Sequence, residues 1–241
     1  MKVFALSDPH LALSVPYRPG RQPAAYKPMD VFGPHWQDYY GALYENWLNV
    51  VEPEDIVLMP GDISWAMTLP EAEHDFAYLA ALPGRIIIVK GNHDYWWKSI
   101  SQVRAALPPN CQALQHNCAI VGSRAVCGSR GWLTPSHPDY SEAEDSKIYA
   151  RELLRIRMAL EEGAQSGLNL VAMLHYPPLN QPNEENDLLA LLREFEVRLV
   201  VYGHIHGLLA KNMPEGFNNG MEFVNASCDR LNFKPRLLWE E

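Results

Sequence analysis

The sequence predicts an α/β fold in which two β-sheets pack together and are flanked by helices. Short apolar runs rich in Val and Ile alternate with helical patterns in the first part of the chain, and strand pairs dominate toward the C-terminus. The early alternation is typical of strands connected by helices, and the later strand pairs favour a second sheet. No repeat or low-complexity linker interrupts the sequence, so we predict one domain over residues 1–241.

Five apolar runs predict the strands of the core. They are Val3–Leu6, Ile56–Met59, Ile86–Val89, Leu170–Leu174 and Leu199–Tyr202. Apolar residues occupy successive positions in these runs, which indicates strands buried on both faces. A hairpin that turns near Gly122-Ser123 and two closing strands complete the prediction, over Ala119–Cys127, Met221–Asn225 and Leu231–Trp239.

Five segments have the pattern of helices. They are His35–Val50, Pro70–Leu82, Trp96–Leu107, Ser141–Glu162 and Glu184–Phe195. The fourth is the clearest, because Ser141 and Glu144 have the spacing of a capping box and Gly163 follows the expected end.

The segment Leu11–Pro34 is long, rich in proline and without periodicity. Such a stretch is usually a functional lid or a disordered excursion. Because it directly follows Asp8 and His10, we expect a lid or a wall of the functional site, with a plain surface excursion as the alternative.

Composition excludes several classes of protein. The net charge of −9 disfavours a basic surface for nucleic acid. The four cysteines form no C-x-x-C pair, so we expect reduced thiols and no zinc ribbon. We see no signal peptide and no apolar stretch of membrane-spanning length, which fits a cytoplasmic protein without a membrane partner.

Side chains that can bind metal follow each of the five core strands. Nine such groups are expected along one edge of one sheet, because ligand sites in α/β proteins lie at the carboxyl ends of the strands. They are Asp8, His10, Asp62, Asn92, His93, Asp94, His175, His204 and His206. Each motif alone has a structural explanation as a turn or surface residue, but their shared position after a strand indicates a metal site.

The residue types fit two divalent cations held close together. Asp62 is the expected bridging ligand, because a carboxylate has two oxygens. One site would then contain Asp8, His10, Asp62 and His206, and the other Asp62, Asn92, His175 and His204. Mixed imidazole and carboxylate ligands favour Mn, Fe, Zn or Co over Ca or Mg, and we expect Mn to give the highest activity.

The expected charge of this centre favours an anionic substrate. Two divalent cations outweigh two carboxylates and a bridging hydroxide, so the centre stays positive and could hold a phosphate. Paired cations activate water and clamp the oxygens of an in-line displacement. His93, with Asp94 as its orienting carboxylate, is then expected to donate a proton to the leaving group.

The motifs and their order resemble the calcineurin-like metallophosphoesterase superfamily, and within it a small bacterial group of phosphohydrolases without an assigned substrate. The matching segments are Asp8-Pro9-His10, Gly61-Asp62, Gly91-Asn92-His93-Asp94, His175 and Gly203-His204-Ile205-His206. The resemblance implies a four-layer α/β/β/α sandwich of two mixed sheets, a dinuclear centre and phosphoester hydrolysis, and it supports His93 as the acid. The chain departs from many relatives in having no second acidic residue soon after Asp62 and no second histidine after His175.

The expected substrate is a phosphorylated small molecule, either a monoester or a diester. Arg130 either clamps its phosphate or forms a structural salt bridge. Tyr95, Trp96, Trp97 and Trp65 either wall a pocket the size of a nucleotide base or pack in the core. The alternative function is a non-catalytic interaction module on the same fold, which the complete ligand set disfavours. The motif order does not fit metallo-β-lactamases or amidohydrolase barrels.

Overall fold

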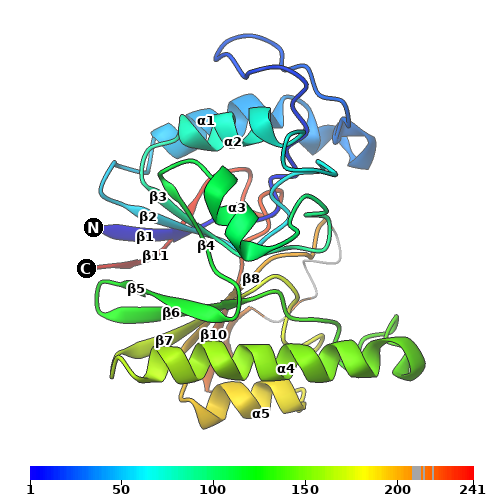
Figure 1. The fold of residues 1–241 in the computed structure, drawn as a ribbon, viewed down its shortest axis with the longest axis vertical. Coiled ribbons are helices and arrows are strands. Elements are labelled where there is room, and N and C mark those ends of the chain that lie inside the picture. Colours follow the sequence, from blue (N-terminus) through cyan, green and yellow to red (C-terminus); the bar gives the residue numbers. More distant parts are fainter. Residues whose placement is uncertain (208–212, 214, 219) are drawn as a thin grey trace.

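The computed structural model describes residues 1–207, 213, 215–218 and 220–241. Two mixed sheets pack face to face, and helices cover the outer face of each sheet (Figure 1). The predicted α/β/β/α sandwich is therefore confirmed.

The five-stranded sheet has the order β11-β1-β2-β3-β4. Its members are β1 (Lys2–Ala5), β2 (Ile56–Met59), β3 (Arg85–Ile88), β4 (Cys111–Ala113) and β11 (Arg236–Glu240). Strands β1 to β4 are parallel, whereas β11 runs antiparallel to β1. The short strand β4 was not predicted, because its three residues are mostly polar or small.

The six-stranded sheet has the order β5-β6-β7-β8-β10-β9. Its members are β5 (Asn117–Val121), β6 (Arg124–Ser129), β7 (Asn169–Leu174), β8 (Leu199–Tyr202), β9 (Gly216–Asn218) and β10 (Met221–Asn225). The central four strands are parallel, and β5 and β9 are antiparallel edge strands. The predicted hairpin is confirmed as β5 and β6, whereas β9 was not predicted from the sequence.

All five predicted helices are present, most of them shorter than expected. They are α1 (Tyr39–Leu48), α2 (Glu73–Ala80), α3 (Ile100–Ala106), α4 (Glu142–Ala164) and α5 (Asp187–Glu194), with 3-10 turns η1 (Asp30–Phe32) and η2 (Pro34–Trp36). Helices α1 and α2 cover the five-stranded sheet, and α4 and α5 cover the six-stranded sheet (Figure 1).

The ends of α4 differ from the prediction. The Ser141 side chain makes no capping bond, and the amide of Ser141 donates instead to Asp145 Oδ2 at 2.8 Å. Asp145 thus takes the role expected of Glu144. The helix continues through Gly163, where a Cβ atom would collide with the thiol of Cys127 on the sheet beneath. Gly163 therefore permits close packing and does not end the helix.

Three apolar layers explain why the strand sequences are continuously hydrophobic. In β1, Val3 and Ala5 face the layer between the two sheets, whereas Phe4 faces the layer beneath α1 and α2. Successive side chains of a strand point to opposite faces, so a strand buried on both sides needs an apolar residue at every position.

The four cysteines are free thiols, as expected.

The segment Leu11–Pro34 is anchored at its base. Leu11, Leu13 and Met29 are buried in the layer beneath α1 and α2. The amide of Tyr26 donates to the carbonyl of Ala12 at 2.9 Å, which pairs the two arms of the segment.

Among the described residues, no helix combines the length and apolar character needed to cross a bilayer.

Candidate metal centre

The predicted metal ligands converge from the carboxyl ends of strands in both sheets. Asp8 and His10 follow β1, Asp62 follows β2, Asn92 follows β3, His175 follows β7, and His204 and His206 follow β8. The expectation of one edge of one sheet is therefore wrong, because β7 and β8 belong to the six-stranded sheet. The two sheets pack face to face, so the ends of their parallel strands meet.

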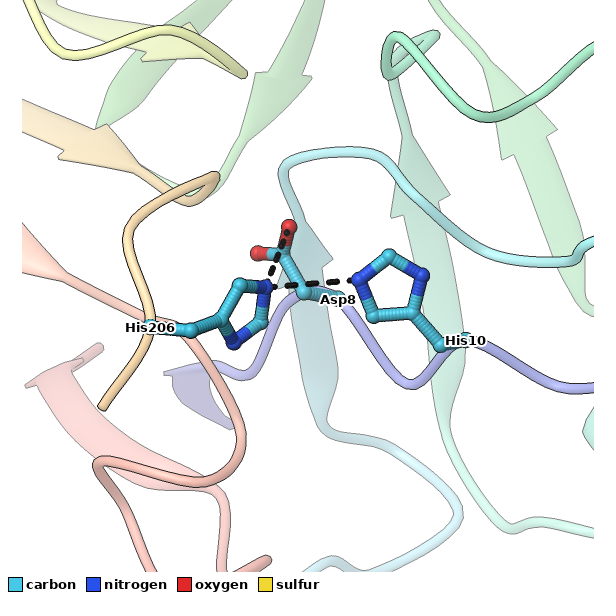
Figure 2. A group of neighbouring side chains, drawn as sticks. All are labelled: Asp8, His10 and His206. Atoms are coloured by element: carbon cyan, nitrogen blue, oxygen red, sulfur yellow. Dashed lines mark hydrogen bonds and ion pairs between the residues drawn. The ribbon is translucent and has the colours of Figure 1, made fainter. Parts of the chain in front are cut away.

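Asp8, His10 and His206 form the first group of donors (Figure 2). The Nε2 atoms of His10 and His206 lie 3.3 Å apart. His206 Nε2 lies 3.6 Å from Asp8 Oδ1. All three side chains thus direct a donor atom toward one point.

Asp229 fixes the orientation of His206. His206 Nδ1 donates to Asp229 Oδ1 at 2.9 Å, and the amide of Gly207 donates to Asp229 Oδ2 at 2.9 Å. Burial alone would lower the pKa of His206, but its hydrogen bonds to Asp229 and Asp8 raise that pKa to about 10. A carboxylate behind a metal-binding histidine selects the ring orientation and strengthens the ligand. Asp229 was not predicted from the sequence, although it follows the predicted strand Met221–Asn225.

Asn92, His175 and His204 form the second group. His175 Nε2 lies 2.6 Å from Asn92 Oδ1 and 3.2 Å from His204 Nδ1, and Asn92 Oδ1 lies 2.9 Å from His204 Nδ1. His175 Nδ1 lies 2.9 Å from the carbonyl oxygen of Pro60, so it carries the proton and leaves a lone pair on Nε2. The Nε2 lone pair then faces Asn92 Oδ1, which is also an acceptor.

Asp62 lies between the two groups. Its Oδ2 atom is 3.8 Å from His10 Nε2 and 3.6 Å from His175 Nε2. Its Oδ1 atom accepts the backbone N–H of His93 at 2.8 Å. Burial, and then the nearby charge of Asp8, raise the pKa of Asp62 well above its ordinary value. The buried carboxylates of Asp8 and Asp62 would therefore be stabilised in their ionised form by nearby positive charge.

This donor set fits a divalent metal centre. Metal–ligand distances of about 2.0–2.2 Å place neighbouring donors roughly 3–3.5 Å apart, close to the spacings seen here. A cation would also relieve the approach of two lone pairs between His175 Nε2 and Asn92 Oδ1. The mixture of imidazole, amide and carboxylate groups suits Mn, Fe, Zn or Co.

The backbone holds these donors in an uncommon conformation. Asp8, His10, Asp62 and His204 have φ angles of 58°, 45°, 50° and 72°. Left-handed backbone is rare outside glycine and concentrates at functional sites. A Cβ atom on Gly203 would meet the carboxylate of Asp8, and one on Gly91 would meet Asp62. These two motif glycines thus allow the ligand loops to approach each other.

Asp94 contacts neighbouring loops and not the ring of His93 in the described structure. Asp94 is fully buried, and its oxygens accept the N–H groups of Ile63, Ser64, Gly91 and Trp96. Asp94 therefore holds the loops after β2 and β3, and none of these bonds orients His93. The ring of His93 lies beside the centre with its buried Nδ1 atom unpartnered among the described residues. Burial, with the charges of His175 and Lys27, lowers the pKa of His93 to about 4.

Trp65 joins His93 to the first group of donors. Its ring stacks on His10 with centroids 4.9 Å apart and lies 4.3 Å from the ring of His93. The Lys27 ammonium sits 3.1 Å from the Trp65 ring centroid, and the Trp65 indole N–H donates to Met29 Sδ. Residues 11–34 thus reach the edge of the centre through Lys27 and Met29.

Two of the other three aromatic residues follow the core-packing alternative and not the base-sized pocket. Trp96 and Trp97 are buried in the core, whereas Tyr95 is 45% exposed. Arg130 follows β6, and its backbone carbonyl accepts the amide of His175 at 2.9 Å. The Arg130 guanidinium lies 3.9 Å from Glu152 and 4.5 Å from the ring centroid of Trp132.

Two solved structures share this fold at low sequence identity. A protein of unknown function, AQ665 from Aquifex aeolicus, is 16% identical, with a TM-score of 0.52, and the alignment covers 98% of this chain and 95% of that one. Phosphopantetheinyl hydrolase (PptH) from Mycobacterium tuberculosis is 14% identical, with a TM-score of 0.52 and coverage of 100% and 96%. These likenesses show the fold alone. No curated protein matches the chain in a sequence comparison.

The family pattern described as calcineurin-like phosphoesterase matches residues 1–208. This range contains every predicted ligand, from Asp8 to His206. The chain therefore belongs to the calcineurin-like phosphoesterase family.

Proposed function

We propose that the protein hydrolyses phosphoester bonds at a dinuclear metal centre. Asp8, His10, Asp62 and His206 would hold one ion, and Asp62, Asn92, His175 and His204 the other. The observation that carries this proposal is the position of Asp62 Oδ2 between His10 Nε2 and His175 Nε2, at 3.8 and 3.6 Å. A carboxylate has two oxygens, so this position supports Asp62 as a shared ligand of both proposed ions. Mn is the favoured metal.

When bound, the two cations supply an activated water and neutralise charge on the phosphate. The protein contributes the arrangement of groups around that reaction. Asp62 accepts the amide of His93, which connects the backbone of His93 to a side chain that would hold the ions. The His93 ring stands beside the centre and would protonate the leaving oxygen. Burial and nearby positive charge lower the pKa of His93, and the negative charge of a bound phosphate would raise it toward the range of an effective acid.

Residues 11–34 would form a wall of the substrate site through Lys27. Its ammonium, held over Trp65 near His93, offers a positive charge to a phosphate oxygen. Arg130, whose carbonyl accepts the amide of His175, would contribute a second cation to the substrate site. Asp94 would act as a positioning residue, because its four hydrogen bonds fix the loop that carries Asn92 and His93.

The proposed substrate is a phosphorylated small molecule, and nucleotides are candidates. Nucleic acid is a poor candidate because the chain carries a net charge of −9. The name of the PptH structure adds a phosphopantetheinyl conjugate to the compounds worth testing.

The direct test is a hydrolysis panel. Metal-stripped protein is reloaded with Mn, Fe, Zn or Mg and assayed against aryl mono- and diesters of phosphate, nucleotides, cyclic nucleotides and a phosphopantetheinyl conjugate. We expect Mn to give the highest rate and His175→Gln to abolish turnover. The matched control is His74→Gln, which changes a histidine on α2 outside the centre.

The alternative, a non-catalytic interaction module, predicts a different outcome. Metal-loaded protein would then hydrolyse none of the esters, although it still bound metal. Equal rates with and without metal would refute the dinuclear mechanism.

A further inference from the structure

A small pocket flanks the metal centre between the two sheets and α4. It has a volume of about 210 Å³ and is lined by residues after β3, β4 and β6 and from the middle of α4. Pockets that enclose a whole drug-sized ligand measure roughly 300–1,000 Å³. This pocket therefore suits one small group of a ligand, not an entire nucleotide.

The lining of this pocket is strongly cationic. Lys90, Lys98, Arg130 and Arg155 all line it, and among the described residues of the lining Glu152 is the one acidic side chain. The positive charges exceed the negative charge at this spot, although the whole chain has a net charge of −9. Cations gathered around a cavity without matching carboxylates are arranged for an anion.

Glu152 leaves much of this positive charge unpaired. It is 2% exposed, and its oxygens accept hydrogen bonds from Arg155 Nη1 at 2.6 Å and from the Ser129 hydroxyl at 3.0 Å. Arg130 lies 3.9 Å from it, and within the described ranges the Arg130 guanidinium makes no hydrogen bond. Lys98 is exposed and forms no ion pair with any residue that the structure describes.

Two backbone connections place the pocket next to the metal centre. Lys90 precedes the ligand Asn92 by two residues, so their Cα atoms are at most about 7 Å apart. The carbonyl of Arg130 accepts the amide of the ligand His175 at 2.9 Å. A ligand bound at the metals could therefore extend into the pocket.

We propose that this cationic pocket binds a phosphate group that is not itself hydrolysed. Arg130 and Arg155 provide planar forks that match phosphate oxygens, and Lys90 and Lys98 add point charges. The group is either free phosphate or a second phosphate on the substrate. Binding of free phosphate is independent of the proposed function, whereas binding of a second phosphate on the substrate rests on that function.

The test is calorimetric titration of metal-stripped protein with inorganic phosphate at low ionic strength. Loss of one hydrogen-bonded charge costs roughly 1.5–3 kcal/mol, so Lys98→Ala and Arg155→Ala should each weaken binding about ten-fold or more. Each variant has a control of equal charge change. Lys147→Ala removes an exposed lysine of α4, and Arg157→Ala removes an arginine of α4 that pairs with Glu194.

The controls decide the result. Unchanged phosphate binding in both controls, with weaker binding in both pocket variants, supports the pocket. Equal weakening in all four variants, or no binding by the wild type, overturns it. Because Arg155→Ala removes a partner of buried Glu152, the melting temperature of this variant is measured as well. Lys98 is exposed, so the phosphate affinity of Lys98→Ala does not depend on a change in folding.

A second arm separates the two sources of phosphate. Michaelis constants of the metal-loaded enzyme are compared for an aryl phosphate with and without a second phosphate group. If Lys98→Ala raises the Michaelis constant only for the doubly phosphorylated ester, the pocket binds a phosphate of the substrate. If the Michaelis constants of both esters respond equally, the pocket binds free phosphate. Complete absence of hydrolysis would refute the proposed function while leaving the calorimetric result intact.

Discussion

Replacement of Asp229 by Asn should weaken one metal site selectively. The Asp229 carboxylate accepts the Nδ1 proton of His206 and the amide of Gly207, both at 2.9 Å, and its side chain is only 3% exposed. Asparagine keeps the shape but removes the charge that strengthens His206 as a ligand. Loss of such a partner typically costs 10–100-fold in metal affinity, or about 1.4–2.7 kcal/mol. The second proposed ion, at Asn92, His175 and His204, should keep its affinity, because none of these residues contacts Asp229 in the described structure.

A metal titration followed by calorimetry measures both affinities. The wild type should show two sites, and Asp229→Asn should show one of them weakened by this factor. NMR titration of metal-stripped protein gives a second readout, because the His206 pKa of about 10 should fall without the Asp229 charge. Asp139→Asn is the matched control, since the Asp139 side chain is 85% exposed. Two unchanged affinities, or an equal loss at both sites, would refute the role assigned to Asp229.

Three further predictions test the surroundings of the centre. Burial raises the pKa of Asp75 from 3.8 to about 6. Between these two pH values the Asp75 carboxyl stays protonated in the folded protein, whereas it has lost its proton in the unfolded chain. Stability should therefore fall as pH rises from 4 to 7, by about 3 kcal/mol for this group, and urea unfolding of Asp75→Asn should lack that part of the decrease. Gly203→Ala would force a methyl group against Asp8 and should cost about 1–3 kcal/mol together with the loss of metal binding; unaltered metal binding would contradict this packing. Lys27→Met should raise the His93 pKa from about 4, because it removes a nearby positive charge, and an unchanged NMR titration curve would place Lys27 away from His93 in solution.

The strands of the core could be predicted because burial on both faces leaves a simple signature. β2, β8 and β10 have the predicted bounds, since Ile56–Met59, Leu199–Tyr202 and Met221–Asn225 are bordered by polar or turn residues. The edge strands β4 and β9 are short and face solvent in part, so their sequences carry no such signature.

Much of the candidate site was also visible in the sequence, because a metal ligand needs a particular side chain directly after a strand. The partners of those ligands were harder to predict. Asp229 is far from His206 in the chain, and only the closing of the second sheet brings them together. Asp94 was assigned to His93 by proximity in sequence, but its oxygens are used by backbone amides and Trp96. The spacing of residues in the sequence does not reveal which backbone N–H groups will need a carboxylate as acceptor.

The origin of the centre in both sheets has a consequence for the stability of the whole molecule. The amide of His204 donates to Asp8 across 196 residues of chain, and the proposed ions would fasten the same two regions more tightly. A ligand that binds only the folded state adds about 2.7 kcal/mol when its free concentration is 100 times its dissociation constant. Metal supply would then affect the stability of the fold as well as the proposed hydrolysis of the ester.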